Sequence, residues 1–422
     1  MRLHSATVTP LPDLAAFGRG VKAALAALGV AALAACAPSP SAQSTAGSSG
    51  GVSNAGSSEA AAAAVDPNAP VTVALLAPTS AASEGVRRAA QDLVAAAQIA
   101  RSERAPANMS LKIYDTRGDQ AGAAAAAANA VRDGAAIILG PLLASSAEAV
   151  GPVAADAGLN VIAFSNDGSV AGGNVWVLGQ TPGDEMRRVF AHAAAQGAGS
   201  VAIAYPQNRY GESVAASATA AARDAGVGVA ALAGYPYDPK RGRGNFDQIS
   251  AAGGDVAAQI RASGADAVLL ADVGNDLASL GSFLNYFDVS PGRYRYLGLS
   301  RWGTRATLRE PSLRGGVFAA ADPSMKASFD RSFQAQMSRR PSTVAGVGYD
   351  AVVAAADMLA AAQRGGGGAF DARAITASSH SGATGDFVLL SDGTNRRGLA
   401  ILQVAGEGFR IVEPAPRVAP GL

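Results

Sequence analysis

Two serines stand where a ligand could be held by hydroxyl groups and helix amides. Ser145 and Ser146 come a few residues after the apolar run 135–139, where a helix is expected to begin. Their hydroxyls, together with the free amides of the first helical turn, could hold an anionic group such as a carboxylate. A helix N-cap is the alternative, because serine favours that position without any ligand.

A second polar pair, Ser165 and Asn166, follows the apolar run 160–164. If both apolar runs are strands of one parallel sheet, their carboxyl ends lie at the same edge of that sheet. Ser165 and Asn166 could then add hydrogen bonds to a ligand held at this edge. As plain turn residues they would need no ligand, so the sequence leaves both interpretations open.

Side chains suited to catalysis are scarce. The sequence contains three histidines and a single cysteine, Cys36, and it has no glycine-rich nucleotide loop and no nucleophile elbow. His192 lies in an alanine-rich helical stretch, where a surface or core role is the usual one. One cysteine can form neither an intramolecular disulfide nor a multi-cysteine metal site. We therefore expect no enzymatic activity, no cofactor and no metal site.

The charge balance points to no strongly charged partner. The chain has 34 basic and 33 acidic side chains, which gives a formal net charge of +1. This balance provides no field that would attract nucleic acid, so we expect no nucleic-acid partner. A length of 422 residues exceeds that of one usual compact domain and favours two core-forming units.

The first 36 residues have the features of a bacterial lipoprotein export signal. Basic residues precede the apolar run 23–35, which is too short to span a bilayer but suits the core of a signal peptide. The run ends in Leu33-Ala34-Ala35-Cys36, which looks like a lipobox whose cysteine sulfur takes a diacylglycerol. An ordinary cleaved signal with an incidental cysteine is the alternative. More than one acyl chain would anchor the protein stably without a spanning segment.

The residues after the lipobox extend this interpretation. Ala37, in place of aspartate, is typical of lipoproteins exported onward to the outer membrane of a Gram-negative cell. The stretch 37–70 is mostly Ser, Gly, Ala and Pro, so it buries too little apolar surface to offset the entropy of ordering. We expect a signal peptide over 1–35, a lipidated cysteine and tether over 36–70, and a location at the periplasmic face of the outer membrane.

Short apolar runs then alternate with helical stretches. Runs that are apolar throughout and separated by helices predict βαβ units, whose parallel sheet is covered on both faces. The series restarts near residue 184, so we expect an α/β fold of two doubly wound lobes that ends in a hairpin with its turn at 391–394. The predicted strands are 71–77, 111–114, 135–139, 160–164, 201–205, 227–231 and 267–270, and the predicted helices are 84–101, 119–133, one from 145, 184–196, 211–225 and 254–263.

Certain short sequence segments, called phrases below, are more specific indicators of a protein family than the alternation of strands and helices. Most of them stand at the end of an apolar run, which is the edge where α/β folds hold ligands. The phrases are Tyr114-Asp115-Thr116, 134–142 with Ser145-Ser146, 161–166, 205–212, Tyr349-Asp350-Ala351 and 382–385.

Together these phrases resemble the leucine-binding-protein-like class of periplasmic type I binding proteins, over about residues 71–412. Three further phrases, 180–185, 296–302 and 311–316, are similar to one branch of that superfamily. This branch is the carboxy-terminal domain of penicillin-binding-protein activators, which are outer-membrane lipoproteins that stimulate peptidoglycan synthases. Longer members of the branch carry a large helical-repeat domain before this one, whereas here a short tether stands in that place.

The resemblance also implies a domain organisation. In this fold the chain crosses three times between two lobes, and a ligand is held in the cleft between them. The crossings would fall near 179–184, 298–304 and 378–384, so that 71–181 and 301–380 form the first lobe and 182–300 and 381–413 form the second.

The resemblance adds further candidate residues. Asp184 matches the position at which amino-acid-binding members place an acid against the ligand's ammonium, and Tyr210 matches an aromatic residue that closes over it. Asp184 also stands in the first turn of a helix, where acids are favoured without a ligand. Asp272, after the run 267–270, is a further candidate for the second lobe. Arg301 and Trp302 are candidates for a docking face, since such side chains often anchor interfaces.

Two functions of different classes remain open. The activator resemblance and Ala37 favour an interaction protein that docks on a peptidoglycan synthase, a penicillin-binding protein, and raises its activity. The set Ser145, Ser165, Asp184 and Tyr210 favours a substrate-binding lipoprotein that delivers a small amino-acid-like solute to the membrane subunits of an ABC importer. We expect the first function and keep the second as the alternative.

Overall fold

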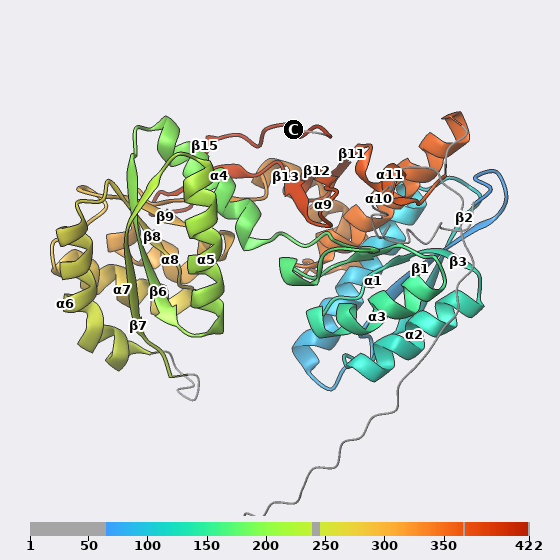
Figure 1. Cartoon of the computed structure of the whole chain (residues 1–422), viewed down its shortest axis with the longest axis horizontal. Helices are drawn as coiled ribbons and strands as arrows, with labels where there is room; N and C mark the ends of the chain where they lie inside the picture. The colour runs from blue at the N-terminus through green and yellow to red at the C-terminus, as the bar shows by residue number, and fades with distance from the viewer. Residues whose placement is uncertain (1–64, 239–244, 366–367, 421–422) are drawn as a thin grey trace, which may run out of the picture. The chain divides into compact units, whose positions relative to one another are not determined.

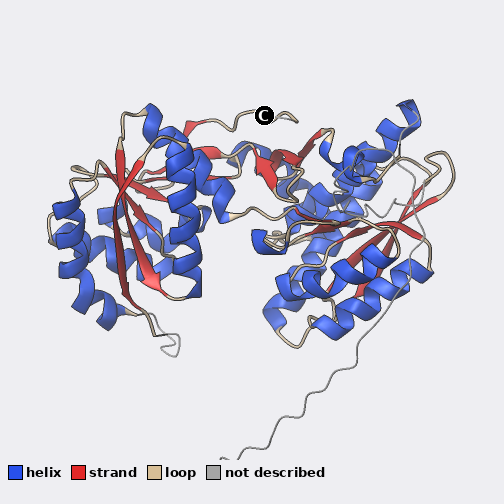
Figure 2. Ribbon diagram, in the orientation of Figure 1, coloured by secondary structure: helices blue, strands red, loops and turns tan. Residues whose placement is uncertain are grey.

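The computed structural model describes residues 65–238, 245–365 and 368–420 of the chain. The expected export signal, the lipobox with Cys36 and nearly all of the tether lie outside these residues, so those expectations stay predictions. In the described part the strands form sheets of five, seven and three strands, and helices cover the two larger sheets (Figure 1, Figure 2). The expected α/β fold with two doubly wound lobes is confirmed.

The first lobe is built on a parallel sheet in the order β2-β1-β3-β4-β5. The order changes direction between β1 and β3, so the carboxyl ends of these two strands form the switch point at which open α/β sheets hold ligands. The strands are β1 (Val71–Ala77), β2 (Met109–Asp115), β3 (Ala135–Leu139), β4 (Val161–Ala163) and β5 (Val175–Val177).

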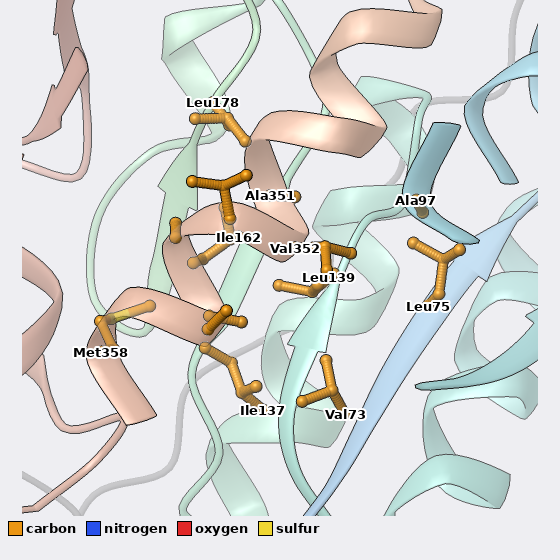
Figure 3. Close-up of a cluster of buried hydrophobic side chains, with 14 of the residues drawn as sticks. Val73, Leu75, Ala97, Ile137, Leu139, Ile162, Leu178, Ala351, Val352 and Met358 are labelled. Atoms are coloured by element: carbon orange, nitrogen blue, oxygen red, sulfur yellow. The ribbon is translucent and has the colours of Figure 1, made fainter. Parts of the chain in front are cut away.

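The central strands of this sheet are apolar throughout because helices cover both faces. The helices are α1 (Glu84–Arg104), α2 (Gln120–Arg132), α3 (Ala144–Asp156) and α10 (Ala345–Gly365). Successive side chains of a strand point to opposite faces. Val73 and Leu75 pack with α1 and α10, whereas Ala74 and Leu76 pack with α2 and α3. Figure 3 shows part of the first of these cores, where side chains of β1, β3 and α10 meet.

The second lobe is built on a sheet in the order β15-β14-β10-β9-β8-β6-β7, parallel from β10 to β7. Val201 and Ile203 of β6 pack with α4 and α5, and Ala202 and Ala204 pack with α6 and α7. The strands are β6 (Ser200–Gln207), β7 (Gly228–Pro236), β8 (Ala267–Leu270), β9 (Arg295–Gly298), β10 (Val317–Ala320), β14 (Ala400–Val404) and β15 (Phe409–Glu413). The helices are α4 (Pro182–Ala195), α5 (Arg209–Asp224), α6 (Phe246–Ser263) and α7 (Gly274–Tyr286).

A small antiparallel sheet belongs to the first lobe. Its strands are β11 (Ser379–Gly382), β12 (Gly385–Leu389) and β13 (Asn395–Arg397). Phe387 of β12 is fully buried in the core of the first lobe. The predicted turn at 391–394 is confirmed, since the Leu390 N–H donates to the Thr394 carbonyl at 2.8 Å.

The second crossing between the lobes lies later in the chain than predicted. β10 pairs with β9 in the seven-stranded sheet, so residues 301–320 belong to the second lobe and their expected place in the first is wrong. The following helix, α9 (Pro323–Met337), packs against α1 through Phe329. The crossing is therefore at 321–322 rather than at 298–304.

The third crossing is also later than predicted. Because the small sheet packs into the first core, residues 381–397 belong to the first lobe and not to the second. β14 then joins the seven-stranded sheet, which places the third crossing at 398–399 instead of 378–384. Both errors have the same cause. A short sequence segment at the end of a strand does not show which distant strand or helix the next element packs against. The first crossing, at 178–181 between β5 and α4, overlaps the predicted range of 179–184.

Among the described helices, only α10 is long and apolar enough to cross a membrane, judged by length and composition. In the structure 72% of its apolar window is buried, as in the core helix of a globular lobe. The remaining short elements are η1 (Gly168–Val170), η2 (Ser300–Trp302), α8 (Arg305–Arg309), η3 (Pro311–Leu313) and α11 (Ala372–Thr376).

Candidate functional site

The turn after β3 brings the start of α3 to the switch point of the first sheet. Gly140 has a φ of +98°, which L side chains rarely adopt. A Cβ atom there would also overlap the carbonyl oxygen of Leu76 on β1. Glycine therefore allows the chain to pass close to β1 and to start α3 beside its carboxyl end.

Ser145 and Ser146 lie in the first turn of α3, but neither is the N-cap. The N-cap is Leu143, and no side chain makes a capping bond, so the alternative interpretation of these serines is wrong. Ser145 is exposed. Ser146 is 1% exposed, and its hydroxyl has no hydrogen-bond partner in the part of the chain that the structure describes.

Thr116 lies at this edge in one of the phrases that carried the resemblance, but it was not among the candidate site residues. It directly follows β2, is 1% exposed, and its hydroxyl likewise lacks a partner among the described residues. Its neighbour Asp115 is already engaged, because it accepts the N–H of Ser80 at 3.2 Å and that of Arg117 at 3.0 Å. The position of Thr116 at the end of a predicted strand was the signal that could have found it.

Ser165 and Asn166 follow β4 at the same edge of the first sheet. Ser165 is buried, and its hydroxyl oxygen accepts the N–H of Asp167 at 3.0 Å. This bond is the local contact expected if Ser165 is a turn residue that binds no ligand. The hydroxyl can still donate one hydrogen bond. Asn166 is exposed and makes no such contact.

The carboxyl edge of the second sheet holds a buried acid, Asp272. It directly follows β8, is 3% exposed, and accepts the N–H of Val273 at 2.8 Å. The hydroxyl of Tyr235 on β7 also donates to it. Burial raises the pKa of Asp272 to about 6. Tyr235 lies far from Asp272 in the sequence, which is why only the acid was predicted.

Tyr210 and Arg301 meet beside this acid. The guanidinium carbon of Arg301 lies 5.0 Å from the centre of the Tyr210 ring, within the range of a cation–π contact. Tyr210 is partly buried, and burial raises the pKa of its hydroxyl to about 12. Arg301 is exposed, so its side chain covers one side of Tyr210 from the solvent.

Trp302 is a core residue, so its predicted role on a docking face is wrong. It is fully buried, and Gly298 and Gly316 leave the space that its ring fills. Its indole Nε1 donates to the carbonyl of Leu270 at 3.3 Å, and its ring centre lies 6.3 Å from that of Phe318. Of the two predicted docking residues, only Arg301 can reach a partner.

Asp184 is held inside the protein, and this contradicts its predicted role against an ammonium group. It is 3% exposed, and its two oxygens accept from Arg187 Nη2 at 2.8 Å and from the backbone N–H of Arg397 at 3.0 Å. Burial raises the pKa of Asp184 even so. No carboxylate oxygen is left without a donor, so Asp184 ties α4 to the end of β13.

Glu185, the next residue, is also fully engaged. Its carboxylate accepts the N–H of Ser300 at 2.7 Å, the Ser300 hydroxyl at 2.8 Å and Gln180 Nε2 at 2.8 Å. It is 5% exposed, and burial raises its pKa to about 7. Glu185 thus connects the first crossing, which contains Gln180, with the loop after β9.

The structure therefore places the candidates in two groups. Thr116, Ser145, Ser146 and Ser165 lie at the carboxyl edge of the first sheet, and Asp272 with Tyr210 and Arg301 lies at that of the second. Asp184 belongs to neither group. In the described residues no group of three or more His, Cys, Asp or Glu side chains is placed to hold a metal ion.

A cavity of about 460 Å³ lies away from both groups, between the end of α4 and the β14–β15 hairpin. His192 and Glu413 line it, and His192 Nδ1 is 2.5 Å from a Glu413 carboxylate oxygen. The second oxygen of Glu413 accepts Arg188 Nη2 at 2.7 Å. This pairing gives His192 a structural role, and no Ser, Thr, Cys or Lys side chain is among the described residues that line the cavity.

Comparisons with known proteins match this fold. A family model described as periplasmic binding protein matches residues 70–408. A putative branched-chain amino acid ABC transporter protein from Rhodospirillum rubrum is 20% identical, with a TM-score of 0.67 over 81% of this chain and 99% of that one. An ABC transporter substrate-binding protein from Sphaerobacter thermophilus is 16% identical, with a TM-score of 0.63 over 83% and 99%. No curated protein matches the chain. At these identities the likeness to solved structures shows the fold alone.

Proposed function

Because the chain belongs to the periplasmic binding protein family, we propose that it is a solute receptor that delivers a small polar solute to the membrane subunits of an ABC importer. The observation that carries this proposal is the buried hydroxyl of Ser146, which has no partner among the described residues. Buried polar groups are almost always hydrogen-bonded, and this one stands beside free helix amides at the switch point of the sheet. A ligand oxygen bound there would satisfy it.

The chemistry of the two sheet edges supports an amino-acid-like solute. The first edge offers donors, namely the amides at the start of α3 and the hydroxyls of Ser146 and Thr116, which suit a carboxylate. The second edge offers the carboxylate of Asp272 and the aromatic face of Tyr210, which suit an ammonium group. In this proposal Asp272 takes the role that was predicted for Asp184.

Export and anchoring belong to the same proposal. Family membership indicates an exported protein. The lipid on Cys36 and the outer-membrane location implied by Ala37 remain predictions from the sequence. Both residues lie outside the described part of the chain. A lipid-anchored receptor would remain close to a membrane while it collects solute.

One set of contacts favours a second candidate function, the activation of a peptidoglycan synthase. Asp184 is paired with Arg187 and the backbone of Arg397, Arg301 covers Tyr210, and Ser165 accepts the N–H of Asp167, so three of the four predicted ligand residues already have partners. A protein that acts by docking needs no free ligand set at these positions. In this second proposal the exposed Arg301, and not Trp302, contacts the synthase.

Calorimetry on the purified full chain with a panel of amino acids tests the receptor function. We expect one class of amino acid to bind, and we expect Ser146→Ala to weaken binding by about 10- to 150-fold, which corresponds to the loss of a hydrogen bond to a charged group. Ser102→Ala, an exposed position on α1, serves as the control and should bind like the wild type. Native mass spectrometry of protein purified without added solute would identify a ligand that the panel omits.

The absence of any bound or binding solute in both measurements would contradict the receptor function. The activator function is then tested by mixing the full chain with each bifunctional peptidoglycan synthase of the source organism. Stimulated glycan polymerisation that Arg301→Ala weakens would support activation. A lack of binding and stimulation with every synthase would exclude it.

A further inference from the structure

Asn395, in β13, lies shortly before the third crossing of the chain and contacts the first crossing. Its side-chain amide nitrogen donates to the carbonyl of Val177 at 2.8 Å and to that of Gly179 at 2.9 Å. Asn395 is fully buried. The first crossing begins at the end of β5, so these two bonds hold the strand that leaves the first lobe against the strand that returns to the second.

Arg397, two residues later, adds a charged contact to the same place. Its Nη2 donates to the carbonyl of Leu178 at 2.6 Å, and its Nη1 donates to an Asp350 carboxylate oxygen at 3.0 Å and to the hydroxyl of Thr384. The side chains of Arg397 and Asp350 are 1% and 0% exposed. A planar guanidinium group with bonds in several directions fixes the orientation of the groups around it.

The backbone of Arg397 reaches the second lobe. Its N–H donates to Asp184 on α4 at 3.0 Å, and Arg187 holds the other oxygen of that carboxylate. Asp350 lies on α10, the core helix of the first lobe. One residue is thus bonded to the first lobe through its side chain and to the second lobe through its backbone.

The second crossing contacts the tail that follows β15. Asp322, which lies in that crossing, accepts the backbone N–H of Ala415, and it also caps α9 by accepting the N–H of Ser324 at 2.8 Å. The tail after β15 also approaches the third crossing, where Gly398 leaves space for the carbonyl of Pro416. The hydrogen bonds of Asn395 and Arg397 therefore hold the end of β13 against the first crossing and against α4.

We propose that Asn395 and Arg397 form a hinge node that sets how the two lobes are positioned, and thereby sets the affinity of the proposed solute site. This inference rests on the proposed receptor function for its consequence, but the node itself does not require a solute. Only those molecules whose lobes are in the binding-competent arrangement can bind solute. The apparent Kd of the receptor is therefore its intrinsic Kd divided by the fraction of molecules in that arrangement. A node that limits the arrangements of the lobes raises this fraction, so Asn395 and Arg397 are positioning residues.

The node is tested in the full chain by Arg397→Met, which keeps the apolar stem and removes the guanidinium group. Arg396→Met, at the adjacent and more exposed position, is the matched control. We expect hydrogen exchange of the amides in 177–185 and 395–399 to be about 10-fold faster in Arg397→Met, with protection of β1 and β6 unchanged. Arg396→Met should exchange like the wild type.

Distances between the lobes provide the measurement that a merely structural role would not change. Spin labels on Glu148→Cys in α3 and Glu212→Cys in α5, two exposed positions, report the separation in a Cys36→Ser background. We expect Arg397→Met to broaden the distance distribution. Asn395→Ser, which loses two carbonyl contacts but no charge, should broaden it less and keeps the test informative if Arg397→Met does not fold.

Local exchange and distances equal to wild type in both node variants would overturn the hinge node. Exchange that rises equally in all strands would also overturn it, because this result indicates only a loss of global stability. Both measurements are made without solute, so failure of the node is distinguished from failure of the receptor function. The receptor function is decided separately by calorimetry.

Discussion

Replacement of Trp302 by alanine distinguishes a core role from a docking role for this residue. The ring is fully buried between the glycines of β9 and the start of β10, and its Nε1 donates to the carbonyl of Leu270. A docking residue could be truncated with little effect on folding. A core residue cannot, because truncation leaves a cavity and an unsatisfied carbonyl.

The size of the expected loss follows from these contacts. Truncation of a buried Trp or Phe to alanine costs about 3–5 kcal/mol, and a buried carbonyl without its donor costs about 1 kcal/mol more. The free energy of unfolding should therefore fall by about 4–6 kcal/mol, which is a large part of the stability of a typical domain. Arg301→Ala, at the exposed neighbouring position, should change it by less than about 0.5 kcal/mol.

Urea unfolding followed by far-ultraviolet circular dichroism measures both variants. This signal is preferable to tryptophan fluorescence, because the chain has only two tryptophans and the substitution removes one of them. We expect a large decrease in the urea midpoint for Trp302→Ala and an unchanged midpoint for Arg301→Ala. A wild-type midpoint for Trp302→Ala would refute the assignment of this residue to the core.

Three further predictions concern single positions. Burial raises the pKa of Glu185 to about 7, so between about pH 4.5 and 7 the native state keeps a proton that the unfolded chain releases. The free energy of unfolding should therefore fall as the pH rises through this range. Urea titrations should show a smaller fall for Glu185→Gln. Gly298→Ala should lower the melting temperature because its Cβ would overlap the Trp302 ring, whereas Gly292→Ala, with only one atom near its Cβ, should not. Cys36→Ala should leave the membrane fraction or remain uncleaved, and normal processing with retention in the outer membrane would count against the lipobox.

The strands whose bounds were predicted most accurately are those buried on both faces. Residues 71–77, 135–139 and 267–270 were predicted with the bounds that the structure has. Their apolar runs are continuous because helices cover both sides of each sheet. β5, β9 and β10 were missed, since runs of three or four residues carry too little pattern to separate a strand from a loop.

The candidate site was predictable only where its chemistry is local. Ser146 could be placed at a helix start because the strand, turn and helix that position it are consecutive in the chain. Asp184 and Trp302 were misassigned because their partners are remote: Arg397 is 213 residues from Asp184, and Leu270 is 32 residues from Trp302. The residues around Asp184 or Trp302 in the sequence do not indicate partners so far away in the chain.

The two buried acids that the sequence singled out differ in how their charge is compensated. Asp184 has the full positive charge of Arg187 at 2.8 Å and a backbone N–H at 3.0 Å. Among the described residues, Asp272 accepts hydrogen bonds from two neutral donors, the hydroxyl of Tyr235 and a backbone N–H, and the nearby charge of Arg301 is exposed to solvent and screened by it. Burial raises the pKa of both acids, that of Asp272 to about 6, and a buried carboxylate without a close cation is costly. A cationic group on a solute would supply the close charge at Asp272 that Arg187 already supplies at Asp184, so we expect Asp272 at the edge of the second sheet to be the acid that contacts such a group.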